Sequence, residues 1–419
     1  MRRLLIVAGL LVLAALIAAG LYEARHQFGG SVLGSATVEY NPRQSAPPPP
    51  ANSPMPSPMF GGVPQRLHVG AGSLRPPFHL DWVAGGKALI EFPPAVAFGR
   101  LYFSNADGDL IALSTRTGAR AWIHRLRRCQ ASAPAVNGAF RGAVYEAFLN
   151  RKPCGTDASD GVVVAVAAGI NRVHWQRNFG ATETSPLIVG GRVYVGSWTG
   201  NVYSVNVITG QPDWTFHAGG AVKDAIAYDR GHLFFGAYDG NLYCLDASTG
   251  KLVWRSPSDR SFLLGRHGNF YSSPAVAYSR VYIGSTDHNV YSYGERTGKL
   301  RWVFQTGGFV YGSPAVWRQR VFVGSYDGTF YALDAASGRK LWSFHANGPI
   351  SGSATVVDGI VYFATLHRRT YGLDARTGKL VWSFHDGAFT PVVTDGKRLF
   401  VVGWSKLYAF SSAAAAPSR

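Results

Sequence analysis

The chain has 419 residues, a formal net charge of +17 at pH 7, and 13% aromatic but only 16% charged residues. This balance excludes a chain disordered throughout, because disordered chains are rich in charge and poor in aromatic residues. The positive charge is consistent with an anionic polymer as partner or with a diffusely basic surface. No basic cluster has the motif context of a nucleic-acid binder, so we expect no nucleic-acid partner.

The first feature along the chain is an uncharged apolar segment, residues 4–21, that follows Arg2 and Arg3. As a helix it would be roughly 27 Å long, which nearly matches the hydrocarbon core of a bilayer. We therefore predict a signal-anchor transmembrane helix over residues 1–27, with the rest of the chain outside the cytoplasm of a bacterium. A cleaved signal peptide is the alternative, since small residues at 18–20 would allow cleavage. No cysteine lies near this segment to carry a lipid.

Residues 28–75 are predicted to form an extracytoplasmic linker. Residues 41–65 read "NPRQSAPPPPANSPMPSPMFGGVPQ". Proline removes backbone donors and favours the extended polyproline II conformation. The sequence thus predicts a semi-rigid spacer that separates the following domain from the membrane.

A repeat of about 40 residues follows, marked by tryptophans whose successive separations are 40, 53, 39, 40, 48, 40 and 40 residues. In most units a Thr-Gly or Ser-Gly pair stands four residues before the tryptophan, as in Ser337-Gly338. The regular spacing indicates eight copies of one structural unit. The marking residues are Trp82, Trp122, Trp175, Trp214, Trp254, Trp302, Trp342 and Trp382.

Each unit contains four short runs rich in Val, Tyr, Phe and Leu, separated by Gly, Asp, Ser or Pro, which is typical of short antiparallel strands. Asp-Gly pairs such as Asp327-Gly328 predict tight hairpins between the second and third strands. We therefore predict an all-β, eight-bladed propeller over residues 76–412, with a flexible tail at 413–419. The unit at 391–410 lacks a tryptophan strand, and the strand of Trp82 lacks partners, so their pairing would close the ring. A seven-bladed ring with a separate module is the alternative.

The segments "GSYDGTFYALDAASGRKLW", "GAYDGNLYCLDASTGKLVW" and "RTYGLDARTGKLVW" resemble the pyrroloquinoline-quinone-like propeller repeat. This family includes quinoprotein dehydrogenases, BamB-type outer-membrane assembly lipoproteins, and exported sensors and scaffolds. The resemblance implies that the eight repeated tryptophans are structural residues packed at the seams between blades, where the repeated glycine allows close approach. Residue chemistry agrees, because a buried indole needs one acceptor for its N–H and a backbone carbonyl can supply it.

The sequence offers no catalytic centre. The resembling dehydrogenases hold their quinone between a tryptophan and a ring of two adjacent cysteines, beside calcium, whereas Cys129, Cys154 and Cys244 are far apart. Hydrolase, zinc and phosphate-loop motifs are also missing. We expect no catalytic residue, cofactor or metal ligand. The alternative is a quinone- and calcium-dependent oxidoreductase or a sugar- or alcohol-binding enzyme.

Two of the cysteines are predicted to form a disulfide. Cys129 falls between two blades, and Cys154 falls in the enlarged hairpin of the next blade, which opens on the same face of a propeller. Export to an oxidising compartment favours a Cys129–Cys154 bond. Cys244 lies within a strand and is expected to be a small buried thiol.

The face that carries the Asp-Gly hairpins is the predicted partner-binding face, because the insertions at 146–160 and 255–273 also emerge there and loops on a rigid ring commonly bind partners. Near the channel, Glu183, Lys223 and Asp224 differ from the residues that other repeats have at these places. They are predicted to form either a structural ion pair or a ligand site. The candidate partner-binding residues are Trp198, Tyr238, Arg260, Arg266, His267, His288, Tyr326, His367, Arg368, Arg369 and Trp404.

These features together predict a non-enzymatic, membrane-anchored propeller outside the cytoplasmic membrane. It would act as a monomeric scaffold or assembly factor for envelope proteins or anionic envelope polymers. A ligand-sensing ectodomain is a further alternative.

Overall fold

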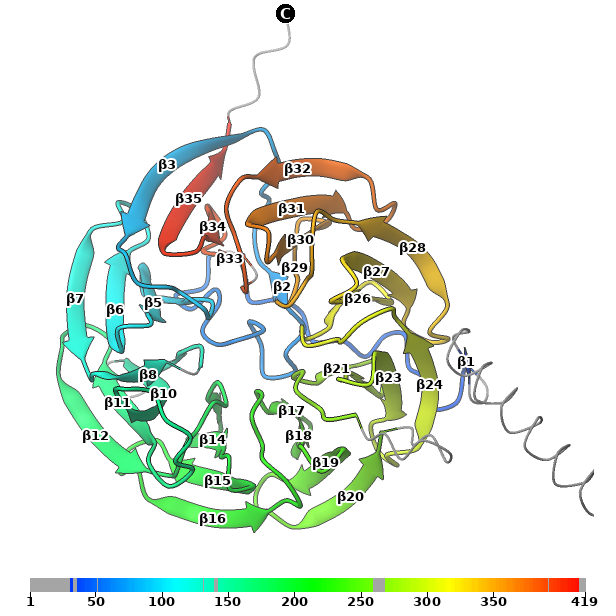
Figure 1. The fold of residues 1–419 in the computed structure, drawn as a ribbon, viewed down its shortest axis with the longest axis horizontal. Helices are drawn as coiled ribbons and strands as arrows, with labels where there is room; N and C mark the ends of the chain where they lie inside the picture. Colours follow the sequence, from blue (N-terminus) through cyan, green and yellow to red (C-terminus); the bar gives the residue numbers. More distant parts are fainter. Residues whose placement is uncertain are drawn as a thin grey trace, which may run out of the picture.

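The computed structural model describes residues 31–32, 36–50, 52–130, 132–138, 142–258, 268–390 and 392–413. Their strands form eight sheets arranged as blades around a central channel (Figure 1). The prediction of an all-β, eight-bladed propeller is confirmed. No helix in the described part of the chain is long and apolar enough to cross a bilayer, and the predicted anchor at residues 4–21 lies outside that part.

The blades are numbered here in chain order, and each runs from a short inner strand at the channel to an outer strand at the rim. Blade 2 carries an additional short strand, β8. Blades 1 to 4 contain β4 (Ala95–Ala97), β5 (Arg100–Ser104), β6 (Asp109–Ser114) and β7 (Arg120–Arg125); β8 (Arg128–Gln130), β9 (Ala135–Asn137), β10 (Ala143–Arg151), β11 (Val162–Ala167) and β12 (Val173–Asn178); β13 (Leu187–Val189), β14 (Arg192–Gly196), β15 (Asn201–Asn206) and β16 (Pro212–His217); and β17 (Ala227–Asp229), β18 (His232–Gly236), β19 (Asn241–Asp246) and β20 (Leu252–Pro257).

Blades 5 to 7 repeat the same order, and blade 8 joins the two ends of the domain. Its outer strand, β3, pairs with β35 from Phe78 opposite Ser412 to Gly85 opposite Lys406, which closes the ring as the repeat count predicted. These blades contain β21 (Ala275–Ala277), β22 (Arg280–Gly284), β23 (Asn289–Gly294) and β24 (Leu300–Gln305); β25 (Ala315–Trp317), β26 (Arg320–Gly324), β27 (Thr329–Asp334) and β28 (Lys340–His345); β29 (Thr355–Val357), β30 (Ile360–Thr365), β31 (Arg369–Asp374) and β32 (Leu380–Phe384); and β33 (Val393–Thr394), β34 (Leu399–Val402), β35 (Lys406–Ser412) and β3 (Phe78–Gly85).

Local turn chemistry fixes the register within each blade, and blade 6 shows how. Gly328 of the Asp-Gly pair has φ of 80°, which glycine adopts without strain, and it closes the β26–β27 hairpin. At the β27–β28 turn, the Asp334 carboxylate accepts hydrogen bonds from the backbone N–H and hydroxyl of Ser337, while Gly338 N–H donates to the Asp334 carbonyl. The repeated Asp and Ser-Gly or Thr-Gly positions are therefore turn residues.

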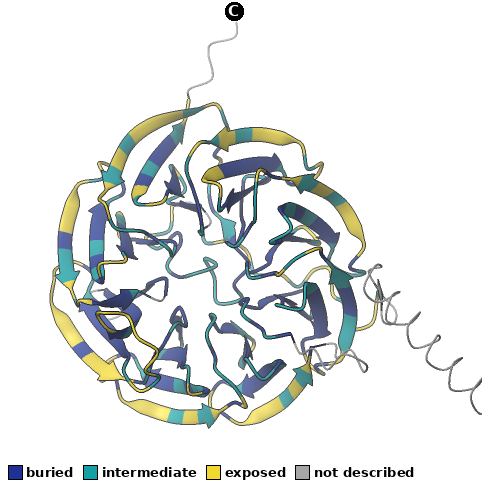
Figure 2. Ribbon diagram, viewed as in Figure 1, coloured by how far each residue is buried: buried dark blue, intermediate teal, exposed yellow. Residues whose placement is uncertain are grey.

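The middle strands of the blades are mostly buried, whereas the outer strands alternate between exposed and covered residues (Figure 2). Tryptophans on the outer strands pack at the seams: the Trp302 indole N–H donates to the Ala335 carbonyl of the next blade at 3.1 Å. A Cβ added to Gly338 would lie 2.7 Å from that indole, so only glycine leaves room for the ring. The corresponding indole-to-carbonyl bonds are Trp82 to Thr115, Trp122 to Ala168, Trp175 to Val207, Trp214 to Ala247, Trp254 to Glu295 and Trp342 to Ala375, whereas Trp382 packs on Phe384 and Phe410.

The N-terminal segment, predicted as a spacer, instead crosses the ring and enters its centre (Figure 1). We call its described part, residues 36–75 apart from residue 51, the strap. Its proline residues lack N–H donors, but their carbonyls accept hydrogen bonds from the ring, so a proline-rich segment can still bind a folded domain through its backbone. The acceptors include the Pro54, Pro58 and Pro64 carbonyls, which accept from the Phe98, Val136 and Tyr228 N–H groups.

Short strands attach both ends of the N-terminal segment to the ring. β1 (Ser31–Val32) pairs with β24 at the rim of blade 5, and β2 (Val69–Gly70) pairs in parallel with the inner strand β29 of blade 7. The strap lies on the face that bears the hairpins between first and second strands, which we call the strap face. The opposite face bears the Asp-Gly hairpins and is called the hairpin face.

Two buried arginines hold the strap in place. The guanidinium of Arg66, on the strap, donates to the carbonyls of Phe60, Ser185, Pro186 and Ile226, so it joins the inner strands of blades 3 and 4. Arg280, on blade 5, donates in the opposite direction to strap carbonyls at positions 36, 38 and 39. Both side chains are fully buried, and each uses backbone acceptors to replace the water that it loses.

Candidate functional site

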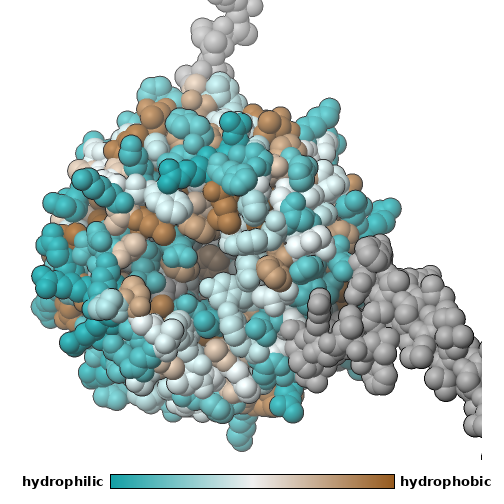
Figure 3. Space-filling view, viewed as in Figure 1, coloured by the Kyte–Doolittle hydropathy of each residue, from teal (hydrophilic) through white to brown (hydrophobic). Residues whose placement is uncertain are grey.

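The central channel ends on the hairpin face in a cavity of ≈ 110 Å³. The strap residue Phe60 closes its inner side, and the segments that enter successive blades supply its walls. Figure 3 shows a hollow at the centre of the ring in the face that it presents. The lining residues are Phe60, Glu91, Phe92, Pro93, Glu183, Ser185, Lys223, Asp224, Tyr271, Tyr311, Ser313, Ser351, Gly352, Ser353 and Phe389.

Serine hydroxyls connect the inner strands around this cavity. The backbone N–H of Ser273 donates to the Ser313 hydroxyl at 3.0 Å, and that of Ser313 donates to the Ser353 hydroxyl at 2.8 Å. The Ala225 N–H donates in the same way to the Ser273 hydroxyl. These links run from one blade to the next and explain the repeated serine before the inner strands as a structural residue that fixes the cavity wall.

Lys223 lies between a carboxylate and two aromatic rings at the cavity edge. Its Nζ is 3.4 Å from Glu183 Oε2, 4.2 Å from the centre of the Trp198 ring and 5.0 Å from that of the Tyr238 ring. An ammonium group is attracted to both the carboxylate and the ring faces. The structure therefore brings together the predicted residues Glu183 and Lys223 as an ion pair, and Trp198 and Tyr238 complete its surroundings.

The carboxyl groups of the cavity are harder to ionise than free ones. Burial raises the pKa of Asp224 to about 7, against the opposing effects of hydrogen bonds from Ser273 and the Ala225 N–H and of the nearby Arg66. Burial also raises the pKa of Glu91, as does the neighbouring Glu183. The pKa of Glu183 is raised by burial as well, although Lys223 lowers it in part. The three groups thus share a poorly solvated space in which their ionised forms are disfavoured unless a cation lies beside them.

Aromatic side chains extend from the cavity across blades 4 to 6 of the hairpin face. The ring of Tyr271 lies 6.0 Å from that of Tyr238 and 5.4 Å from that of Tyr311, which in turn lies 5.1 Å from the ring of Tyr326. Phe309 packs beside Tyr311 and Tyr326 and remains 40% exposed. We call these five residues the aromatic arc.

The remaining predicted partner-binding residues surround this arc at the hairpins. His288 contacts the ring of Phe309 and has φ of 72°, at the turn position that blades 1, 3, 4 and 6 fill with glycine. In blade 7 the guanidinium of Arg368 lies 4.7 Å from the centre of the Trp404 ring, which is 36% exposed. His367 and Arg369 are exposed beside Arg368, whereas Arg260, Arg266 and His267 lie outside the described residues.

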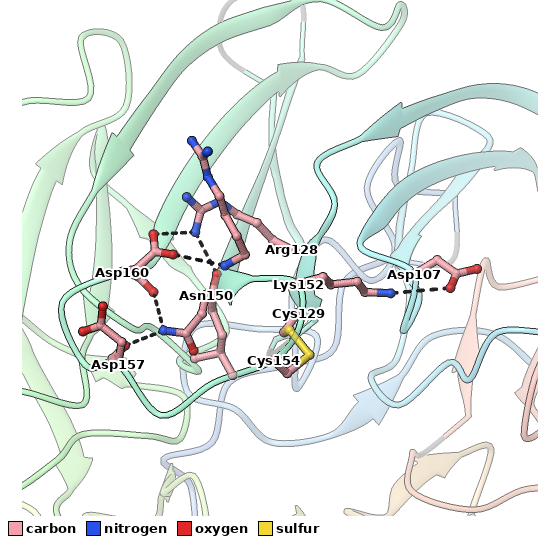
Figure 4. The surroundings of a disulfide bond; sticks show 10 residues. Asp107, Arg128, Cys129, Asn150, Lys152, Cys154, Asp157 and Asp160 are labelled. Carbon is pink, nitrogen blue, oxygen red and sulfur yellow. Dashed lines mark hydrogen bonds and ion pairs between the residues drawn. A yellow bond between two sulfur atoms is a disulfide. The ribbon is translucent and has the colours of Figure 1, made fainter.

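The insertion of blade 2 forms a cross-linked loop on the hairpin face (Figure 4). A disulfide joins Cys129 on β8 to Cys154, with a Cα–Cα distance of 5.7 Å. Arg128 forms an ion pair of 2.8 Å with Asp160, and Lys152 reaches Asp107 of blade 1 at 3.5 Å. The insertion predicted at 146–160 is thus partly strand, because β10 continues to Arg151, and the rest is a fastened loop. Cys244 is buried, and burial raises the pKa of its thiol.

Several residues of the site were not predicted from the sequence. Glu91, Tyr271, Tyr311 and Phe389 stand shortly before an inner strand, at the place that Glu183 occupies in its own unit. When the repeats are aligned on the inner strand, the residue type at this place varies from blade to blade. This variation within an otherwise constant pattern is the signal that identifies them. Phe60 carries no such signal, because its place in the channel depends on the path of the strap.

This ring of repeated blades, with its variable residues gathered at one end of the channel, defines a PQQ-like β-propeller. Residues 80–256, 199–308 and 239–384 match the family model described as outer membrane protein assembly factor BamB, and the chain belongs to this family. The resemblance seen in the repeats is thereby confirmed.

Individual relatives are distant. BamB of Shewanella oneidensis is 27% identical over 151 residues, which are 32% of this chain and 34% of the relative. The chain spans about a third of the length of the curated relatives it matches. The crystal structure of BamB from Moraxella catarrhalis has a TM-score of 0.65 at 16% identity and covers 80% of this chain and 99% of that one. A europium-containing methanol dehydrogenase has a TM-score of 0.72 at 13% identity and covers 86% and 99%, so these two structures share the fold.

Proposed function

We propose that this protein is a non-enzymatic scaffold of the cell envelope that binds other envelope proteins through its hairpin face. Membership of a family described as an assembly factor supports this role. The observation that carries it is the asymmetry of the ring: the strap covers one face, while the other presents the aromatic arc and the fastened loop of blade 2. Exposed aromatic residues on a rigid frame are frequent anchors of interfaces.

We further propose that residues 4–21 anchor the protein in the cytoplasmic membrane as a single pass. The length and apolar character of this segment support the proposal. Fractionation of cells with and without residues 1–27 tests it. Retention of the shortened chain in the membrane fraction would contradict the anchor.

Photocrosslinking in intact cells tests the scaffold role. A benzophenone amino acid at Phe309 or Tyr326 of the arc should capture envelope proteins, whereas the same group at Phe98 on the strap face, which is 37% exposed, should not. Equal capture from both faces, or capture from neither, would contradict a partner-binding hairpin face.

The cavity does not fit the quinone of the structurally similar dehydrogenases. Pyrroloquinoline quinone carries three carboxylates, and Glu91, Glu183 and Asp224 would repel them. Within the described ranges, no group of three or more His, Cys, Asp or Glu side chains is placed to hold a metal ion that could bridge these charges. Dye reduction by the purified protein after incubation with quinone and calcium would overturn the non-enzymatic role.

A further inference from the structure

We infer that the cavity at the channel mouth binds a primary amine, presented as the lysine side chain of a protein held on the hairpin face. The identification of a protein lysine as the source rests on the proposed function. Recognition of the amine itself rests only on the charges, rings and size of the cavity.

The charges of the cavity favour a cation. Glu91, Glu183 and Asp224 line it, and Lys223 is paired with Glu183. Arg66 lies behind Asp224, but its guanidinium hydrogens are directed at backbone carbonyls. Among the residues that the structure describes, no salt bridge joins Glu91 to a cation. The cavity therefore holds more carboxyl groups than cations, although the whole chain has a net charge of +17.

The walls supply the second element of amine recognition. Lys223 shows that an ammonium is accommodated here between a carboxylate and the faces of Trp198 and Tyr238. Tyr271 and Tyr311 line the same cavity as Glu91, Glu183 and Asp224. Carboxylates beside aromatic rings thus recur away from Lys223, a combination that attracts ammonium groups.

The size of the cavity limits what can enter. Its ≈ 110 Å³ is below the range of about 300 to 1,000 Å³ that is usual for small-molecule sites. The end of one side chain fits such a space better than a polymer or a planar cofactor does. An anionic polymer would in addition meet the carboxyl groups, so an amine on a side chain agrees with both size and charge.

Calorimetric titration of the purified full-length protein in detergent tests this inference, with n-butylammonium as the probe and n-butanol as its neutral control. The ammonium should bind and the alcohol should not. Glu183→Gln and Asp224→Asn should each weaken binding about tenfold or more, since each removes a charge-assisted contact. Asp213→Asn, which alters an exposed ion pair on β16, should leave the affinity unchanged.

One further variant acts in the opposite direction and separates binding from misfolding. Lys223→Met removes the resident ammonium and should strengthen n-butylammonium binding severalfold, a result that damage to the fold would not produce. Equal binding of n-butanol, unchanged affinity in Asp224→Asn, or weaker binding in Lys223→Met would overturn the inference. Loss of crosslinking from the hairpin face with intact ammonium binding would refute the scaffold role and leave the amine site standing.

Discussion

Replacing Arg66 by methionine should detach the strap from the channel. The change removes a fully buried guanidinium and leaves the carbonyls of Ser185, Pro186 and Ile226 without this donor. Hydrogen bonds to a charged group contribute about 1.5 to 3 kcal/mol each, but the variant also avoids burying a charge, which costs several kcal/mol. These two effects partly cancel, so we expect the free energy of unfolding to fall by about 3 to 5 kcal/mol.

Thermal unfolding followed by circular dichroism measures this loss. For a domain of this size, such a change corresponds to a fall in melting temperature of about 5 °C. Arg43→Met is the matched control, because Arg43 is an exposed residue of the same strap. Limited proteolysis should cut the strap faster only in Arg66→Met. Equal melting temperatures and equal proteolysis in the two variants would show that Arg66 does not secure the strap.

Three other outcomes are expected. Replacing Cys129 and Cys154 by serine opens a loop of 25 residues and should lower the free energy of unfolding by up to about 3.5 kcal/mol. Denaturant unfolding measures this loss, and an unchanged denaturation midpoint would contradict a stabilising role of the disulfide. The pKa of Asp224 is raised from 3.8 to about 7, so its contribution to stability is fully present below its ordinary pKa and is lost as the pH rises to about 7. Asp224→Asn should therefore flatten the plot of melting temperature against pH between about 4 and 7. Parallel plots for the two proteins would argue against this titration. Gly378→Ala should lower the free energy of unfolding by about 1 to 3 kcal/mol more than Gly99→Ala does. Both glycines have positive φ, but only at Gly378 would the added Cβ lie 2.7 Å from an indole ring. Equal losses of stability in the two variants would contradict the steric explanation.

The repeat unit was predictable because each of its parts performs one local task. The spacing of the tryptophans reflects the seam between blades, and pairs such as Asp327-Gly328 reflect turns that require positive φ. The closure of the ring by β3 followed from counting strands at the two ends. Glu183, Lys223 and Asp224 also stood out, because they interrupt a pattern that was otherwise constant.

The strap was not predictable in the same way, because its contacts join residues far apart in the chain. Arg66 meets the Ile226 carbonyl across 160 positions, and its sequence neighbourhood is rich in proline and glycine. Nothing local distinguishes it from a solvent-exposed arginine. Tyr271 and Tyr311 were overlooked for another reason: in sequence they resemble the many aromatic residues of the strands, and only the shared position before the inner strand separates them.

The course of the strap has a consequence for the order in which the protein can fold. β2 needs β29, β3 needs β35, and Arg66 needs the inner strands of blades 3 and 4, so residues 36–85 have no complete set of partners until the last blade has been synthesised. Blades 1 to 7 are built from neighbouring strands and can form as the chain emerges. The closure of the ring and the insertion of the strap into the channel must then occur together and late in folding. Both depend on contacts between residues far apart in the sequence, and such contacts slow folding. Until they form, apolar surface is exposed to chaperones.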